Sequence, residues 1–199
     1  VLSLALSKQG NLIVINSAGD LFNVDSKTGN VYWSLSVAGS TYAHATDFFK
    51  TSNIVLSGDD IIFSAGYITY SFNLKNAYMN WEQNVNSIGT PVIDGENIFI
   101  VTNNGFLIIL DKVGGKIISS KNILQVLKEK KQETNITGFI MGSGKIYSVT
   151  KNGYLITSSA ISGKAESYKK IGDIIMSNPI ISNGKLYVLT RNMKLFGFN

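Results

Sequence analysis

TPVIDGENIFIVTNNGFLIILDKVGGKIISS, residues 90–120, is the stretch of the sequence that decides the fold. Short apolar runs alternate in it with Asp-Gly, Asn-Gly and Gly-Gly pairs. β-branched and aromatic residues favour the pleated surface of a strand, and the glycine pairs reach positive φ at little steric cost, which favours tight reversals. The stretch therefore predicts four short strands joined by three tight turns, which together form one antiparallel meander.

The same unit recurs along the chain. Residues 19–29 align with residues 105–115 without a gap, at an offset of 86 residues with one further unit between them, so the mean period is 43. Later similar segments are 48 residues apart (Gly105 and Gly153) and 40 residues apart (Ser143 and Asn183). A single sheet cannot bury both of its faces, so each unit must stack on its neighbours. This period predicts an all-β fold, a β-propeller of four-stranded antiparallel blades.

The whole chain, residues 1–199, is predicted to form a single partial β-propeller domain with about 4.5 blades. The last unit has room for only three strands, as happens when a propeller closes its ring with a strand from the other terminus. We expect open sheet faces and an open edge at the ends, which favours self-association of the chain. A five-bladed ring closed by the strand around Leu4 is the alternative. The predicted blades cover approximately residues 4–37, 54–85, 88–123, 136–170 and 176–198.

One turn geometry marks the repeat. Asp25 opens a turn and is expected to accept backbone N–H bonds from residues ahead, Gly29 is expected to have positive φ, and Trp33 is expected to fill the gap to the adjacent blade. We expect both tryptophans to be largely buried, and Gly115 to share the backbone conformation of Gly29. The predicted structural repeat residues are Asp25, Gly29, Trp33, Asn73, Trp81, Asp111 and Gly115.

Residues 121–135, KNILQVLKEKKQETN, break the repeat. Ile123, Val126 and Leu127 have helical spacing, but a polar tail follows them. The pattern predicts an exposed loop with one helical turn.

Residues 25–33, DSKTGNVYW, resemble the PQQ-type β-propeller repeat, whose signature is Ala-x-Asp-x-x-Thr-Gly-x-x-x-Trp, although Asn23 stands where that family prefers alanine. Further features are similar to the BamB branch of this family, the outer-membrane assembly lipoproteins, in its alphaproteobacterial form. They are residues 89–93 (GTPVI), the lysine-rich segment 121–135 with Thr137-Gly138 after it, and the ending at residues 178–198. The resemblance implies the C-terminal half of an eight-bladed ring.

The resemblance also implies a function. A BamB-type chain is expected to be a non-catalytic scaffold that supports outer-membrane β-barrel protein assembly through contacts of its inter-blade loops. Its partner would be the barrel-forming subunit of the assembly machinery, and its location the periplasmic face of the outer membrane. The lipid anchor of such a lipoprotein would lie in an N-terminal part outside this chain. Two alternatives are a fragment of a PQQ-dependent dehydrogenase and a ligand-sensing extracytoplasmic propeller.

The charge pattern argues against a nucleic-acid partner. The net charge of +5 comes almost entirely from lysine, with Arg191 the only arginine. Most lysines are scattered over predicted turns, while the aromatic residues occupy strand positions. Nucleic-acid surfaces combine clustered Arg and Lys with exposed aromatic residues, so we expect no nucleic-acid binding. No apolar run approaches the ~18 residues of a membrane-spanning helix.

The sequence predicts no catalytic, cofactor or metal site. His44 is the only histidine and has Asp47 three residues later, but no nucleophile-elbow serine or cysteine and no second metal ligand accompanies this pair. Asp59-Asp60 lacks the alternating oxygen ligands of a calcium loop. Quinone-dependent dehydrogenases with this repeat hold the quinone beside a vicinal cysteine pair, and this chain has no cysteine. We therefore expect a protein that is not an enzyme.

The segment 38–53 supplies the candidates for partner binding. Its Phe48-Phe49 pair lies outside the strand pattern, close to His44 and Asp47. Two such aromatic residues form either a buried plug between blades or an anchor for a partner, and the sequence leaves both interpretations open. His44, Asp47, Phe48 and Phe49 are the predicted partner-binding residues.

Overall fold

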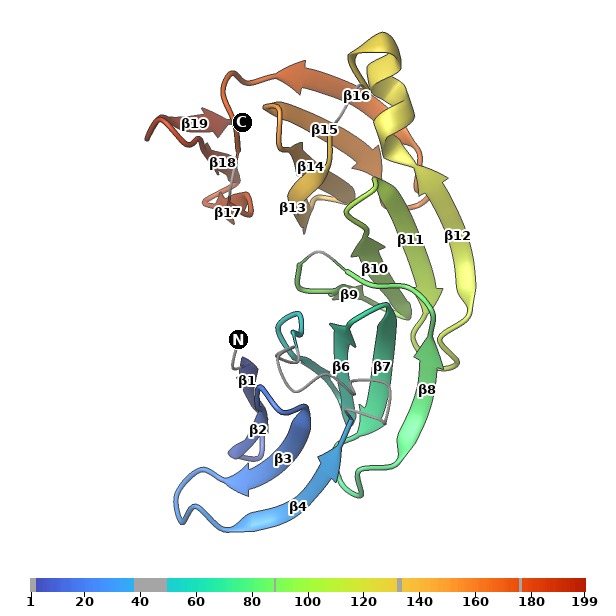
Figure 1. Ribbon diagram of the computed structural model, residues 1–199, viewed down its shortest axis with the longest axis vertical. Helices are drawn as coiled ribbons and strands as arrows, with labels where there is room; N and C mark the ends of the chain where they lie inside the picture. Colours follow the sequence, from blue (N-terminus) through green and yellow to red (C-terminus); the bar gives the residue numbers. More distant parts are fainter. Residues whose placement is uncertain (1–2, 38–49, 88, 132–133, 176) are drawn as a thin grey trace. The chain divides into compact units, whose positions relative to one another are not determined.

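The computed structural model describes residues 3–37, 50–87, 89–131, 134–175 and 177–199, and these form five antiparallel sheets and one 3-10 helix (Figure 1). Within those ranges, no helix has the length and apolar character that crossing a membrane requires. The contacts divide the chain into two compact units, described separately below. Unit 1 comprises residues 1–86 with 113–115, and unit 2 comprises residues 87–112 with 116–199.

Unit 1 contains two four-stranded sheets, with strand orders β1-β2-β3-β4 and β5-β6-β7-β8. Each strand pairs with the next along the chain, as expected for a meander. β1 pairs with β2, so the strand around Leu4 belongs to the first sheet of unit 1. The strands are β1 (Ser3–Leu6), β2 (Asn11–Ile15), β3 (Asp20–Asp25), β4 (Val31–Ser36), β5 (Val55–Ser57), β6 (Asp60–Ala65), β7 (Ile68–Asn73) and β8 (Met79–Gln83).

Unit 2 contains two four-stranded sheets, β9 to β12 and β13 to β16, and one three-stranded sheet, β17 to β19. Four four-stranded sheets and one of three strands confirm the predicted fold class, an all-β partial propeller. The elements are β9 (Val92–Asp94), β10 (Asn97–Val101), β11 (Phe106–Asp111), β12 (Ile117–Asn122), the 3-10 helix η1 (Ile123–Lys131), β13 (Ile136–Gly142), β14 (Lys145–Thr150), β15 (Tyr154–Ser159), β16 (Ala165–Lys170), β17 (Ile180–Ser182), β18 (Lys185–Leu189) and β19 (Leu195–Phe198).

The core of unit 1 lies between its two sheets. Side chains alternate across a strand, so Ile13 and Ile15 on β2 and Leu21 on β3 share one face and are fully buried. Ile61 and Phe63 on β6 pack against them from the second sheet. Burial of side chains of this size contributes about 1.5–3 kcal/mol each, which holds the two sheets together.

Unit 2 corrects the prediction made for the lysine-rich segment. Its first half is not an exposed loop, because η1 places Ile123, Leu124 and Leu127 in the core formed with β11, β14 and β15. Lys128 has φ 50° and ψ −122°, so the helix is kinked at the point where the polar tail begins. The helical spacing in the sequence predicts the helical turn. It does not show that the neighbouring sheets enclose these apolar side chains.

The same side-chain-to-backbone hydrogen bond forms in the repeated turns although the residue type differs between blades. Asp25, Asn73 and Ser159 occupy the same position in three blades, and the side-chain oxygen of each accepts a backbone N–H bond from the residue two positions ahead, at 2.8, 2.9 and 3.2 Å. Short polar side chains that bond the backbone just ahead of them favour turns in this way. Hydrogen-bonding capacity is therefore what this position requires, and a carboxylate is one way to supply it.

The last residue of these turns adopts a left-handed backbone. Gly29 has φ 76° and Gly115 has φ 68°, so the prediction of positive φ is confirmed for both. Ala77 stands at the equivalent position with φ 61°, although an L side chain is disfavoured there. Its N–H donates to the Asn73 carbonyl at 3.0 Å, as the Gly29 N–H does to the Asp25 carbonyl at 2.9 Å.

The two tryptophans differ in burial. Trp81 is 8% exposed, and its ring lies so close to Gly115 that a Cβ built on that glycine would be 2.5 Å from Trp81 Cδ2. Trp33 is less enclosed than Trp81, but it is partly buried and packs against the core of unit 1. Its indole N–H donates to the Leu74 carbonyl at 2.9 Å, which still ties β4 to the second sheet of unit 1.

Candidate interaction surfaces

The predicted partner-binding residues His44, Asp47, Phe48 and Phe49 lie within residues 38–49, outside the described residues. The structure therefore does not place them, and their role stays a prediction.

Unit 1 has an apolar groove that is lined in part by Val37, the residue just before position 38. The groove has a volume of about 750 Å³ and lies between β4 and the β6–β8 side of the second sheet, and Val37 lines it. Tyr67 is 87% exposed, Tyr78 74% and Met79 52%, and all three line the groove. Exposed tyrosine and methionine are enriched in the cores of protein interfaces. Sequence reasoning missed this groove, because its residues come from turns and from strands with an ordinary alternation of apolar and polar residues.

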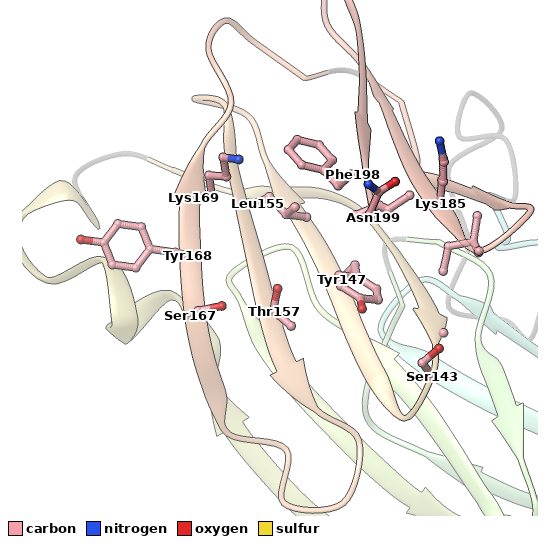
Figure 2. A pocket seen from close by; sticks show the side chains of 14 residues that line it. Ser143, Tyr147, Leu155, Thr157, Ser167, Tyr168, Lys169, Lys185, Phe198 and Asn199 are labelled. Carbon is pink, nitrogen blue, oxygen red and sulfur yellow. The ribbon is translucent and has the colours of Figure 1, made fainter.

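Figure 2 shows a smaller pocket in unit 2, of about 260 Å³, between the β13–β16 sheet and the three-stranded sheet. Ser167 and Lys169 on β16 point toward the pocket, while Tyr168 points to the opposite side of the strand. Lys169 Nζ lies 5.0 Å from the centre of the Phe198 ring, so the lysine spans the pocket to reach β19. Such a cation–π contact stabilises the two strands against each other without closing the pocket.

Strand β19 is the edge of its sheet beside this pocket. The Thr190 N–H donates to the Lys194 carbonyl at 3.0 Å, and hydrogen-bonded pairs alternate along an antiparallel ladder. The backbone groups of Leu195 and Gly197 therefore point away from β18, toward the open side. A fourth strand is able to pair there, as the sequence analysis expected for the final unit.

The first and last sheets also expose apolar side chains. Leu4 and Leu6 on β1 are 57% and 64% exposed, and Ile180 on β17 and Leu195 on β19 are 62% and 66% exposed. The uncovered apolar surface expected for both terminal sheets is therefore present.

A second pocket of unit 2, of about 530 Å³, has a cationic rim. It is lined by Thr137, Lys151, Ile174, Ile175 and Arg191, and it lies where the β14–β15 turn meets the β18–β19 turn. Sequence reasoning missed it, because Lys151 and Arg191 are far apart in the sequence and each reads as an ordinary turn residue.

Among the described residues, the titratable groups with shifted pKa values are Asp25 and Tyr32. Over residues 3–37, 50–87, 89–131, 134–175 and 177–199, no three His, Cys, Asp or Glu side chains lie close enough together to hold a metal ion. Backbone N–H bonds from Thr28 and Lys27, with a hydrogen bond from the Tyr32 hydroxyl, hold the pKa of Asp25 below its ordinary value. The bonded Asp25 carboxylate in turn raises the pKa of Tyr32. Tyr32 is exposed and Asp25 is partly buried, and the hydrogen bonds of both stabilise the turn.

Comparison with known proteins gives the same architecture. The crystal structure of BamB from Moraxella catarrhalis matches with a TM-score of 0.74 and 16% identity, over 99% of this chain and 60% of that chain. The β-propeller domain of Cps50 (Swd1) from Myceliophteria thermophila matches with 0.72 and 13%, over 98% and 63%. The computationally designed Ika8 protein matches with 0.74 and 8%, over 98% and 57%. These identities show the fold alone, and the chain spans about 60% of the BamB structure.

The sequence itself carries the family relationship. A search of the curated proteins returned no match. The family model described as "Outer membrane protein assembly factor BamB" matches residues 2–121, which is more than half of the 199 residues. The turn signature at residues 25–33 lies within that match, and the propeller fold extends over the rest of the described chain. The chain therefore belongs to the PQQ-like β-propeller family of the outer membrane protein assembly factor BamB.

Proposed function

We propose that this chain is a non-catalytic scaffold of the BamB type, which supports outer-membrane β-barrel protein assembly through protein–protein contacts. The family match over residues 2–121 is the observation that carries the proposal. A scaffold needs surfaces rather than reactive groups, and both units have such surfaces. Unit 1 has an apolar groove rich in exposed tyrosine, and unit 2 has an open strand edge.

The proposed partner is the barrel-forming subunit of the assembly machinery, and the proposed location is the periplasmic face of the outer membrane. Partner contacts are proposed for the inter-blade segment 38–53 through His44, Asp47, Phe48 and Phe49. The neighbouring groove supports this assignment, because Val37 lines the groove and leads directly into that segment.

Binding to the purified periplasmic domains of that subunit tests the proposal. The 199-residue chain, immobilised through a C-terminal tag, should retain those domains, and a different propeller of similar size should not. Retention should fall when Phe48 and Phe49 are both changed to alanine, and should persist when the exposed Tyr168 is changed to alanine as a matched loss of one aromatic ring. No retention of the domains by the unaltered chain contradicts the proposal.

The alternative of a PQQ-dependent dehydrogenase fragment predicts a different result. Incubation with quinone and calcium should then give dye-linked alcohol oxidation. The scaffold proposal expects no turnover above the quinone alone, since the chain has no cysteine pair to hold the quinone. Turnover that depends on the chain would overturn it.

A further inference from the structure

The cationic pocket of unit 2 is built on fixed backbone. The Lys151 N–H donates to the Asn135 carbonyl at 2.8 Å, and the Arg191 N–H donates to the Ile174 carbonyl at 2.8 Å. Ile175 is fully buried, forms an isolated antiparallel β-bridge with Thr190 and gives the pocket an apolar floor. Both cationic residues thus stand on anchored turns beside an apolar surface, so the backbone beneath them needs no reordering when a ligand binds.

The charge around this pocket is mainly positive. Lys170 Nζ donates to the Asn152 carbonyl beside Lys151 and lies 4.5 Å from the centre of the Tyr154 ring, which holds a third positive charge at the same turn. Lys194 follows Arg191 in the β18–β19 turn and is exposed. Among the described residues, Asp173 supplies a carboxylate next to Ile174, and its Oδ1 accepts the Ile174 N–H at 2.7 Å.

Two of these cations, Lys151 and Arg191, stand outside the ion pairs of the described residues. The ion pairs of the described residues join Lys75 to Asp59, Lys112 to Glu96 and Lys145 to Glu166. Lys151 and Arg191 take part in none of them, and none of the described side chains that line the pocket they share is acidic. The guanidinium group presents donors in a planar fork that fits a carboxylate, and arginine is among the residues enriched at binding hot spots.

We propose that this pocket docks a short acidic segment of a partner protein. A carboxylate of that segment lies between Arg191 and Lys151, and an adjacent apolar side chain covers Ile174 and the buried Ile175. The inference rests on the proposed function, since it gives a protein-binding scaffold one specific attachment site. A second copy of this chain is a poor occupant, because each copy carries a net charge of +5 and brings like charges together.

The test uses the 199-residue chain and a short fluorescent peptide with a Glu-Leu-Glu core, and binding is followed by fluorescence anisotropy. The matched peptide has a Gln-Leu-Gln core. We expect the acidic peptide to bind with an affinity that falls as salt is raised, and the glutamine peptide to bind at least about tenfold more weakly. Equal binding of the two peptides overturns the proposal.

Charge reversals locate the site. Arg191→Glu and Lys151→Glu should each weaken binding of the acidic peptide by about 30-fold, as expected for loss of one partner of a close charge pair. Lys164→Glu removes the same charge from the β15–β16 turn, at the other end of β15, and should leave the affinity within about threefold. An equal loss in all three variants means non-specific attraction to a basic protein and overturns the proposal.

Competition identifies the kind of ligand. Free glutamate should not displace the peptide at concentrations that far exceed those of the peptide, because the leucine contributes contacts with Ile174. Displacement by glutamate as effective as by unlabelled peptide means a small-anion site and overturns the proposal. If the Arg191→Glu chain still retains the barrel-forming subunit but loses the peptide, the proposed function stands and a different protein is the owner of the acidic segment. If the unaltered chain binds the peptide but not the subunit, the proposed function fails and the docking site stands.

Discussion

Substitution of the last glycine in two equivalent turns separates backbone strain from packing. Gly29 and Gly115 have φ 76° and 68°, so alanine is strained to a similar extent at both positions. A Cβ at Gly29 meets no atom within 4 Å, whereas a Cβ at Gly115 lies 2.5 Å from Trp81 Cδ2 and 2.6 Å from its Cε3. The left-handed conformation costs an L residue about 1–2 kcal/mol, and the stiffer unfolded chain offsets about 0.4–1 kcal/mol of this. Gly29→Ala should therefore cost about 1 kcal/mol.

Gly115→Ala should cost more, because the Trp81 ring must move. Overpacking of a filled site costs typically about 1–3 kcal/mol, so the total should be about 2–4 kcal/mol. Urea denaturation followed by tryptophan fluorescence measures both variants, with Trp33 still reporting when Trp81 is absent. In a Trp81→Ala background the cost of Gly115→Ala should fall to that of Gly29→Ala. Equal costs for the two glycines in the wild-type background, or no coupling to Trp81, would refute this account of the packing.

Three further predictions concern the turns and the lysine-rich segment 121–135. Ala77→Gly should leave the free energy of unfolding unchanged or raise it by up to about 1 kcal/mol. Glycine relieves the strain of φ 61°, but it also increases the conformational entropy of the unfolded chain. A loss above about 1 kcal/mol in urea denaturation contradicts the left-handed conformation of Ala77. The lowered pKa of Asp25 means that its contribution to stability is present above its ordinary value of 3.8 and is lost as pH falls further. Asp25→Asn should therefore lose less stability than the wild type on acidification below about pH 4, and identical pH profiles contradict this. Leu127→Ala should lower the free energy of unfolding by about 2–5 kcal/mol, because its side chain is 1% exposed in the core. Lys128→Ala should change it by less than about 0.5 kcal/mol. Equal effects of the two substitutions would mean that this segment is an exposed loop.

Local patterns predicted the elements of this fold well, because the turns carry their own chemistry. The Asp25 turn bonds its own backbone and ends on a left-handed glycine, and both features depend on residues within a few positions of one another. The spacing of eight residues between Asp25 and Trp33 recurs between Asn73 and Trp81, and this spacing predicts the second blade although its turn lacks the glycine. Ala77 is the exception, since nothing in its identity predicts positive φ and only its alignment with Gly29 does.

Features that depend on distant parts of the chain were not predictable in the same way. Leu124 is buried because the neighbouring sheets enclose η1, and the lysines that follow it in the sequence pointed to solvent instead. The cationic pocket arises where two turns from different sheets meet, so neither Lys151 nor Arg191 carries a local signal. The candidates chosen from sequence, which include Phe48 and Phe49, lie outside the described residues and stay predictions.

Titration calorimetry is the sharpest test of the proposed binding of this chain to the barrel-forming subunit of the outer-membrane assembly machinery. The periplasmic domains of that subunit are titrated into the 199-residue chain, with the Phe48→Ala/Phe49→Ala double variant as the matched comparison. The account predicts saturable binding of one subunit per chain, with a negative heat-capacity change from buried apolar surface and a clear loss of affinity in the variant. Heats that do not differ from dilution, with a chain shown to be folded by its cooperative urea transition, would contradict it.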